Sequence, residues 1–297
     1  MKNLANELKN IIKDYIIFKP KNKDELQKAV DLWCEDKEEA LKLYGHISNW
    51  DTSLITDMRK LFYEKNKFND NINNWDVSSV TDMDSMFSDA SLFNQPLDSW
   101  DVSSVTNMCA MFHEAKSFNQ PLNSWNVSSV NNMNSMFFKA SSFNKPLDSW
   151  NVSKVTIMEC MFFSAFEFNQ PLEQWDVGNV KNMDGMFMGA KSFNQPLGEW
   201  NVSKVTNMNG MFFEAINFNQ PLNSWDVSSV ISMEFMFEEA ESFNQPLNSW
   251  DVSSVICMEF MFKKAESFDK SNFLLYKEES FDKSNFFNHN YNIFRPF

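Results

Sequence analysis

The side chains that could carry out chemistry are few and scattered in this sequence. Only three histidines occur in 297 residues, His46, His113 and His289, and their spacing suits neither general acid–base catalysis nor a metal site. Six glycines are too few to build a phosphate-binding loop. We therefore expect no catalytic, cofactor-binding or metal-ligating residues, no cofactor, and no enzymatic activity.

The four cysteines do not form a recognisable framework. Cys34, Cys109, Cys160 and Cys257 are unevenly spaced, and no pair has the short separation that is typical of zinc ligands. We expect free thiols at these positions, in preference to a disulfide or a zinc site.

Acidic residues are abundant, but their pattern indicates a role in hydrogen bonding and not a role that depends on their charge. The residue after each repeated tryptophan is Asp in most cases, and Asn at Asn126, Asn151 and Asn201. Because Asp and Asn replace each other there, we predict that their shared oxygen accepts a hydrogen bond in a turn or on a strand surface; a row of calcium sites is the alternative. The formal net charge of −14 argues against nucleic acids and anionic membranes as partners.

The elements that position these side chains follow a strict period. Met, Phe and Asn recur at fixed distances after each tryptophan, and a fixed period of this length is typical of one small unit stacked on copies of itself. The tryptophans recur every 25 residues, at Trp50, Trp75, Trp100, Trp125, Trp150, Trp175, Trp200, Trp225 and Trp250.

Two periodicities alternate within one unit. Trp100 and Val102 lie two residues apart with polar neighbours, which predicts a short strand with one buried face. Val105, Met108, Phe112 and Ala115 then fall on one face of a helix about ten residues long. An asparagine lies 19 residues after each of the first eight tryptophans, and it predicts an internal ladder of side-chain amides that bond to neighbouring coils.

The repeated motif V-T-x-M-x-x-M-F-x-x-A-x-x-F-N-Q-x-L-x-x-W-D-V-S resembles the BspA-type leucine-rich-repeat surface proteins, in their 25-residue Trp/Met/Phe subtype. The resemblance covers about residues 46 to 268. It implies a leucine-rich-repeat-like protein that acts through protein contacts, often at cell surfaces, and it transfers no catalytic residues.

The predicted fold class is an α/β repeat solenoid, leucine-rich-repeat-like, with about nine 25-residue coils that each contain a short parallel strand and a short helix. Residues 1–45 are predicted to form an N-terminal helical cap, with one helix from Leu4 to Ile16 and a second from about Asp24 to Tyr44. Residues 46–268 form the nine-coil repeat, and 269–297 an irregular C-terminal tail.

A hydrophobic stripe is the candidate partner-binding site. Four successive central coils carry an apolar residue 13 positions after the tryptophan, and two further apolar residues follow three positions later. The alternative is that these side chains are half-buried beneath the next coil. The candidate residues are Phe138, Phe163, Phe166, Met188, Phe213 and Ile216.

These observations predict a non-catalytic scaffold for protein–protein recognition, with one or more protein partners of unknown identity. The alternative is a structural or adhesive surface component that self-assembles through its ends. We expect no signal peptide and no membrane insertion, because charged residues interrupt every apolar run near the N-terminus. The resemblance suggests the cell surface, an intracellular location fits the sequence at least as well, and the oligomeric state is open.

Overall fold

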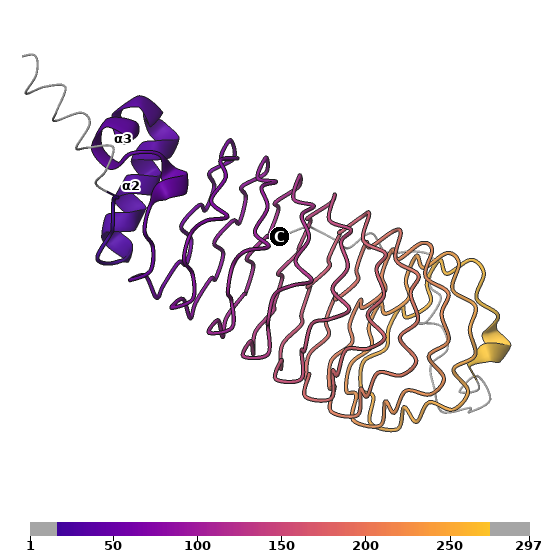
Figure 1. The fold of residues 1–297 in the computed structure, drawn as a ribbon. Coiled ribbons are helices and arrows are strands. Elements are labelled where there is room, and N and C mark those ends of the chain that lie inside the picture. Colours follow the sequence, from indigo (N-terminus) through magenta and orange to yellow (C-terminus); the bar gives the residue numbers. More distant parts are fainter. Residues whose placement is uncertain (1–16, 274–297) are drawn as a thin grey trace, which may run out of the picture.

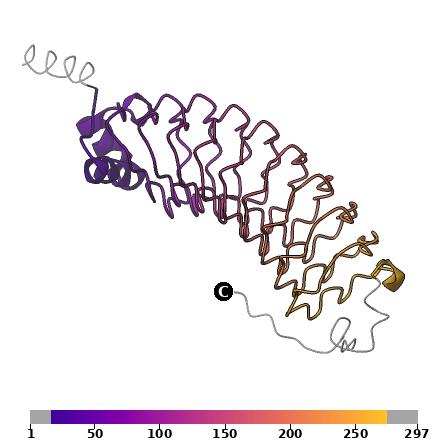
Figure 2. The same cartoon turned by 90° about the horizontal axis from the view of Figure 1, so that it is seen from below.

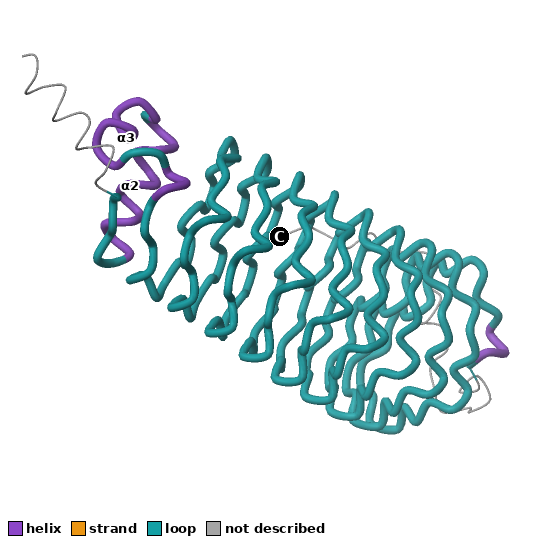
Figure 3. The backbone as a smooth tube through the Cα atoms, in the orientation of Figure 1, coloured by secondary structure: helices purple, strands orange, loops and turns teal. Residues whose placement is uncertain are grey.

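The computed structural model describes residues 17–273 and contains little regular secondary structure (Figures 1 and 3). Two α-helices lie near the start of this part, α2 (Lys23–Glu35) and α3 (Lys37–Tyr44), and are followed by the 3₁₀ turn η1 (Ile47–Asn49). A second 3₁₀ turn, η2 (Lys270–Asn272), lies at its other end. Residues 50–269 form a stack of coils built from turns, without an α-helix or a strand.

The prediction of an α/β repeat solenoid is therefore wrong. Below, positions are counted from each tryptophan as position 0. The predicted helix spans positions 5–15, but residues at positions 10 and 14 adopt positive φ, as Ser85 (55°) and Asp89 (60°) do. Residues in the left-handed region break the helical path every fourth residue. The short apolar spacings that suggest a helix arise here from consecutive turns.

Backbone hydrogen bonds in this segment run between coils. Within one coil, the Met86 amide donates to the Met83 carbonyl and closes a turn. Alternate amides instead donate to the next coil, as from Ser85 to the Cys109 carbonyl (2.8 Å) and from Phe87 to Met111 (2.9 Å). These two kinds of bond pair many backbone groups of this segment without regular secondary structure.

The backbone segment that pairs between coils is also a different one from the segment that the sequence predicts. Isolated parallel bridges join position 7 of each coil to position 7 of the next, from Asp57↔Asp82 to Ser232↔Cys257. The strand predicted around Trp100 and Val102 is instead a turn, in which the Val105 amide donates to the Val102 carbonyl. The segment predicted as helix therefore pairs, and the segment predicted as strand does not.

Rows of identical side chains form the core of the stack. The rings of Trp125 and Trp150 lie 6.5 Å apart and nearly parallel, and those of Phe137 and Phe162 lie 5.6 Å apart. From Trp75 onward, each indole N–H also donates to a backbone carbonyl of the preceding coil, as from Trp150 to Leu122 at 2.9 Å. Stacking at the 25-residue period thus buries the aromatic rows and satisfies their polar atoms.

Two predicted hydrogen-bond patterns are confirmed. The side-chain oxygen of each asparagine at position 19 accepts the amide of its equivalent in the next coil, as Asn144 does from Asn169 at 3.0 Å. This ladder is only partly buried. The Asp or Asn at position 1 accepts the amide two residues later, for example Asp101 from Ser103 at 3.0 Å, in a turn.

Helix α2 covers the first coil of the stack (Figure 1). Trp33 of α2 packs edge-on against Trp50 with centroids 5.9 Å apart, and its indole donates to Asp70. The helix begins as predicted, with the Asn22 side chain capping the Glu25 amide. The single helix expected to Tyr44 is divided at Asp36, whose side chain caps α3. The predicted helix Leu4–Ile16 lies outside the described residues.

The stack bends, as Figure 2 shows. At position 13, the rings of Phe138 and Phe163 lie 4.4 Å apart, whereas those of Trp125 and Trp150 lie 6.5 Å apart. Neighbouring coils are thus closer together at position 13, which lies in the segment that bonds between coils, than at the tryptophans. The bridged side therefore lies on the inside of the bend.

Candidate functional site

The side chains that point away from the core on the bridged side form the candidate site, which we call the bridged face. It is defined by positions 7, 9, 10 and 13, whereas position 8 is buried in every coil. Because each row repeats every 25 residues, chemistry on this face is arranged in lines that run along the stack.

Position 13 provides an apolar row on the bridged face, formed by Phe138, Phe163, Met188 and Phe213. All four side chains are partly buried, and successive rings stack where both residues are aromatic. Of the two predicted neighbours, Phe166 is 42% exposed and Ile216 is partly buried. The four residues at position 13 thus follow one line, and Phe166 and Ile216 lie three positions further along their coils, at the edge of this row. Whether these residues bind a partner stays a prediction.

The two ends of the apolar row are marked by polar groups. At one end His113 stacks on Phe138 with ring centroids 4.5 Å apart, and burial lowers the pKa of this histidine. At the other end Glu238 and Lys263 form an ion pair of 2.7 Å, with both side chains largely buried. The row is therefore confined to the coils between them.

Position 9 provides a carboxylate row beside the apolar row, formed by Glu159, Asp184, Glu234 and Glu259. Residues 17–273 supply no ion-pair partner for these four carboxylates. Burial, and then the charge of Glu159, raises the pKa of Asp184. Burial, and then the charge of Glu259, likewise raises the pKa of Glu234. The row thus consists of two pairs of carboxylates without cationic partners, on either side of the neutral Asn209.

Small residues separate the two rows in the central coils. Position 10 holds Cys160, Gly185 and Gly210 there. A Cβ atom added to Gly185 would lie 3.2 Å from the Cys160 sulfur and 3.7 Å from Met188. Only small side chains therefore lie between positions 9 and 13 on the surface of these coils.

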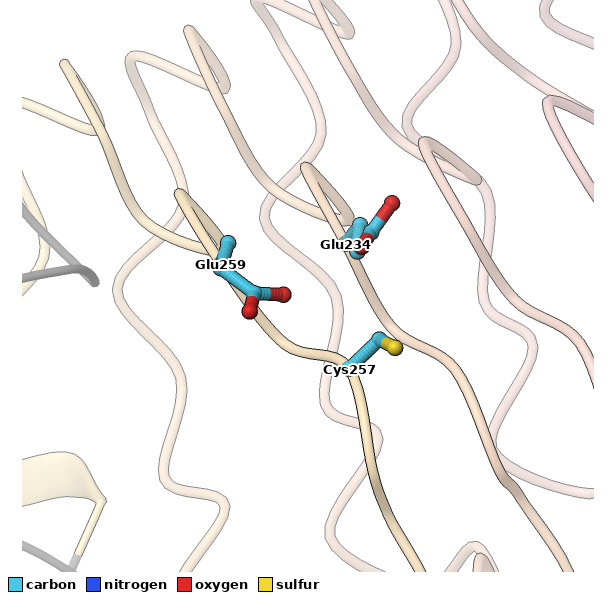
Figure 4. A group of neighbouring side chains, drawn as sticks. All are labelled: Glu234, Cys257 and Glu259. Atoms are coloured by element: carbon cyan, nitrogen blue, oxygen red, sulfur yellow. The ribbon is translucent and has the colours of Figure 1, made fainter. Parts of the chain in front are cut away.

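A cluster of two carboxylates and a thiol lies at the last two described coils (Figure 4). One ligand atom each of Glu234, Cys257 and Glu259 can be chosen so that all lie within 4.8 Å of one another. Burial, followed by the charge of Glu234, raises the pKa of the Cys257 thiol. Glu234 and Glu259 lie 25 residues apart and Cys257 two residues before Glu259, so the repeat period is the signal that could have revealed this cluster.

A surface depression lies elsewhere, around Trp175. It is open, has a volume of about 410 Å³, and includes the exposed carboxylates of Glu173, Asp176 and Glu199. The raised-pKa carboxylates of the bridged face lie outside it. This depression therefore lacks the carboxylates of raised pKa, Asp184 and Glu234.

Comparison with known proteins gives a family match over most of the chain. A family model described as "Mycoplasma protein of unknown function, DUF285" matches residues 35–146, 122–211 and 196–294. Comparison with curated proteins gives no match. The three successive matches show a tandem repeat. Within residues 17–273, neither helix has the length and apolar character needed to cross a bilayer.

Proposed function

The chain belongs to the family described as Mycoplasma protein of unknown function, DUF285, and we propose that it is a non-catalytic repeat scaffold that binds a protein partner on the bridged face. The observation that supports this proposal most is the partly exposed apolar row beside an uncompensated carboxylate row. The narrower kinship with BspA-type surface proteins is part of the proposal and is supported by the repeated sequence motif.

The two rows favour one kind of partner segment. Phe166 and Ile157 are 42% and 37% exposed in the central coils, so an apolar partner can still gain contact area there. Glu159 and Asp184 lie in the same coils without a cation. An extended peptide that combines Lys or Arg with apolar side chains would satisfy both rows, and its attraction would weaken with salt.

Selection from a displayed library of random peptides tests the proposal. The immobilised full chain should enrich peptides that combine basic and apolar residues, and their binding should weaken as the salt concentration rises. The double substitution Phe163→Glu and Phe213→Glu should weaken binding by at least about tenfold, because it places charge in the apolar row. No enrichment, or equal binding to the double variant, would contradict the proposal.

A matched control separates binding from folding. Ile256 is 78% exposed at position 6, outside the apolar row, so Ile256→Glu should leave peptide binding unchanged. Phe163 stacks on Phe138, and its substitution also costs stability. Phe166→Ser removes a more exposed ring that lies under the Lys191 ammonium, and provides a milder test if the double variant unfolds.

Static light scattering separates this function from the structural alternative. A recognition scaffold should keep the mass of one chain as its concentration rises through the micromolar range. A component that self-assembles through its ends would instead increase in mass, and that result would favour the structural alternative.

A further inference from the structure

In several coils, the side chain at position 7 forms a hydrogen bond with the preceding coil. It donates a hydrogen bond to the residue at position 9 of that coil in three consecutive pairs near the C-terminal end of the stack. These bonds are Asn182 to Glu159 (3.0 Å), Asn207 to Asp184 (3.4 Å) and Ser232 to Asn209 (2.5 Å). In these three pairs, position 7 thus supplies an amide or hydroxyl donor to the preceding coil.

The next pair changes this chemistry. Cys257 occupies position 7 and faces Glu234 at position 9 of the preceding coil, while Glu259 approaches from its own coil (Figure 4). A thiol is a weaker donor than an amide and a far better metal ligand. Among the described residues, the Oε2 atom of Glu259 is buried and has no hydrogen-bond partner. The nearby Lys263 and Lys264 are paired with Glu238 and Glu239.

We propose that Glu234, Cys257 and Glu259 form a binding site for a divalent transition-metal ion of the zinc type. One thiolate and two carboxylates are a ligand set that zinc accepts, and three protein ligands leave a fourth tetrahedral position for water or a partner's side chain. Ligand atoms at zinc distances of about 2.0–2.3 Å lie about 3.3–3.6 Å apart in a tetrahedron. Ligand atoms that already lie within 4.8 Å therefore reach this geometry by small side-chain rotations.

The site would fasten the last two described coils to each other. Two of its ligands come from one coil and one from the preceding coil, so the ion adds a link between coils where the stack ends. Glu234 and Glu259 belong to the carboxylate row but lie beyond the apolar row, so metal binding at this cluster can be tested whether or not a peptide binds the central coils.

Cobalt(II) is the probe that tests the assignment, because a thiolate bound to it gives a charge-transfer absorption in the near ultraviolet. The reduced full chain should bind one equivalent of Co²⁺ with this absorption, and Zn²⁺ should displace it. Cys257→Ser should abolish the absorption and weaken Zn²⁺ binding by more than about 100-fold, since loss of outer-shell partners alone costs about 10–100-fold. Absence of the absorption in the unaltered chain, or its persistence in Cys257→Ser, would overturn the proposal.

The chain offers two matched controls. Cys109→Ser removes a thiol at position 9 and should leave the Co²⁺ absorption intact; its loss would count against the site. Asn182→Cys places a thiol between Glu159 and Asp184, in the arrangement that Cys257 has between Glu234 and Glu259. This variant should bind a second equivalent of Co²⁺, whereas a single equivalent would contradict the geometry proposed.

A measurement on the unaltered chain avoids any effect of substitution on folding. Zn²⁺ should slow alkylation of Cys257 by iodoacetamide, followed by mass spectrometry, without slowing alkylation of the exposed Cys34. Equal rates of Cys257 alkylation with and without Zn²⁺ would overturn the proposal.

Discussion

Single residues hold each coil to the next through a few repeated contacts. Indole N–H groups donate to carbonyls of the preceding coil, and asparagine oxygens accept amides of the following one. The asparagine ladder and the Asp/Asn turns could be predicted, because one polar atom type recurs at one position. The indole partner could not, because the donor and the carbonyl, as in Trp150 and Leu122, are 28 residues apart.

Removing one rung of the asparagine ladder should destabilise the protein. Asn144→Ala leaves the Asn169 amide and the Gln170 side chain without their acceptor, and should lower the free energy of unfolding by about 1–3 kcal/mol. Asn144→Asp keeps an accepting oxygen and should cost less. Urea unfolding of the two variants checks this order, and an equal loss in both would show that the ladder does not stabilise the stack.

The raised pKa of Asp184 predicts the direction in which the stability of the protein changes with pH. An acid whose pKa is raised in the folded state adds stability below its unfolded pKa of about 3.8, and that contribution is lost as pH rises through the folded pKa. Asp184→Asn should therefore increase the unfolding midpoint in urea at pH 7. This gain should disappear at about pH 3, where the carboxyl is protonated in both states.

Asp101 provides the control for that measurement. Hydrogen bonds from Ser103 lower the pKa of Asp101, so ionisation of this group favours the folded state. Asp101→Asn should leave stability at pH 7 unchanged or slightly lower. A gain of equal size in both variants would mean that reduced overall negative charge, rather than the surroundings of Asp184, is responsible.

At the scale of the elements, apolar spacing predicts a helix where the structure has consecutive turns. Buried residues at positions 5, 8, 12 and 15 have the spacing of a helix face, yet they lie on turns with left-handed residues at positions 10 and 14. A signal does exist in the sequence: Gly185, Gly189 and Gly210 occupy those positions and all have positive φ. The other coils place non-glycine residues there, which hides the pattern.

The substitution Ala110→Gly should change the free energy of unfolding in opposite directions for consecutive turns and for a helix. Ala110 has φ of 50°, a conformation that costs a residue with a Cβ atom about 1–2 kcal/mol. The substitution should raise the free energy of unfolding by about 0.5–1 kcal/mol after the greater flexibility of unfolded glycine is included. In a helix the same change would lower it by about 1 kcal/mol.

The buried Ala115 is the control for this substitution. Its φ is not positive, so Ala115→Gly should destabilise the protein under either description. Denaturant unfolding of both variants gives the comparison, and a loss of stability in Ala110→Gly would contradict the turn-based fold.

At the scale of the whole molecule, the 25-residue period sets both the fold and the surface. Because residues 25 apart become neighbours, the sequence alone could align the apolar residues from Phe138 to Phe213. It could also have shown the cluster of Glu234, Cys257 and Glu259. Glu259 lies one full period of 25 residues after Glu234, and Cys257 lies two residues before Glu259. The bridged face could not be foreseen, because it depends on which segment pairs between coils.

Deleting one full period should preserve the stack. Removal of residues 151–175 keeps every row in register and should leave a monodisperse protein that melts cooperatively, with the loss of about one interface between coils. Removal of 151–163 moves all later rows out of register and should abolish cooperative melting. Calorimetry with size-exclusion chromatography checks this, and similar behaviour of the two deletions would contradict stacking at this period.

Cross-linking between neighbouring coils tests the central claim most directly. In a chain whose four native cysteines are replaced by serine, Asn182→Cys and Asn207→Cys occupy a parallel bridge, where adjacent chains lie about 4.8 Å apart. Mild oxidation should join them, since a disulfide spans Cα distances of about 4.4–6.8 Å, and mass spectrometry should detect the bond in a chain of unchanged melting temperature. The pair Asn132→Cys and Asn182→Cys, two coils apart, should stay reduced. Failure of the first pair to join, as expected if helices packed about 8–10 Å apart occupied these positions, would contradict the account.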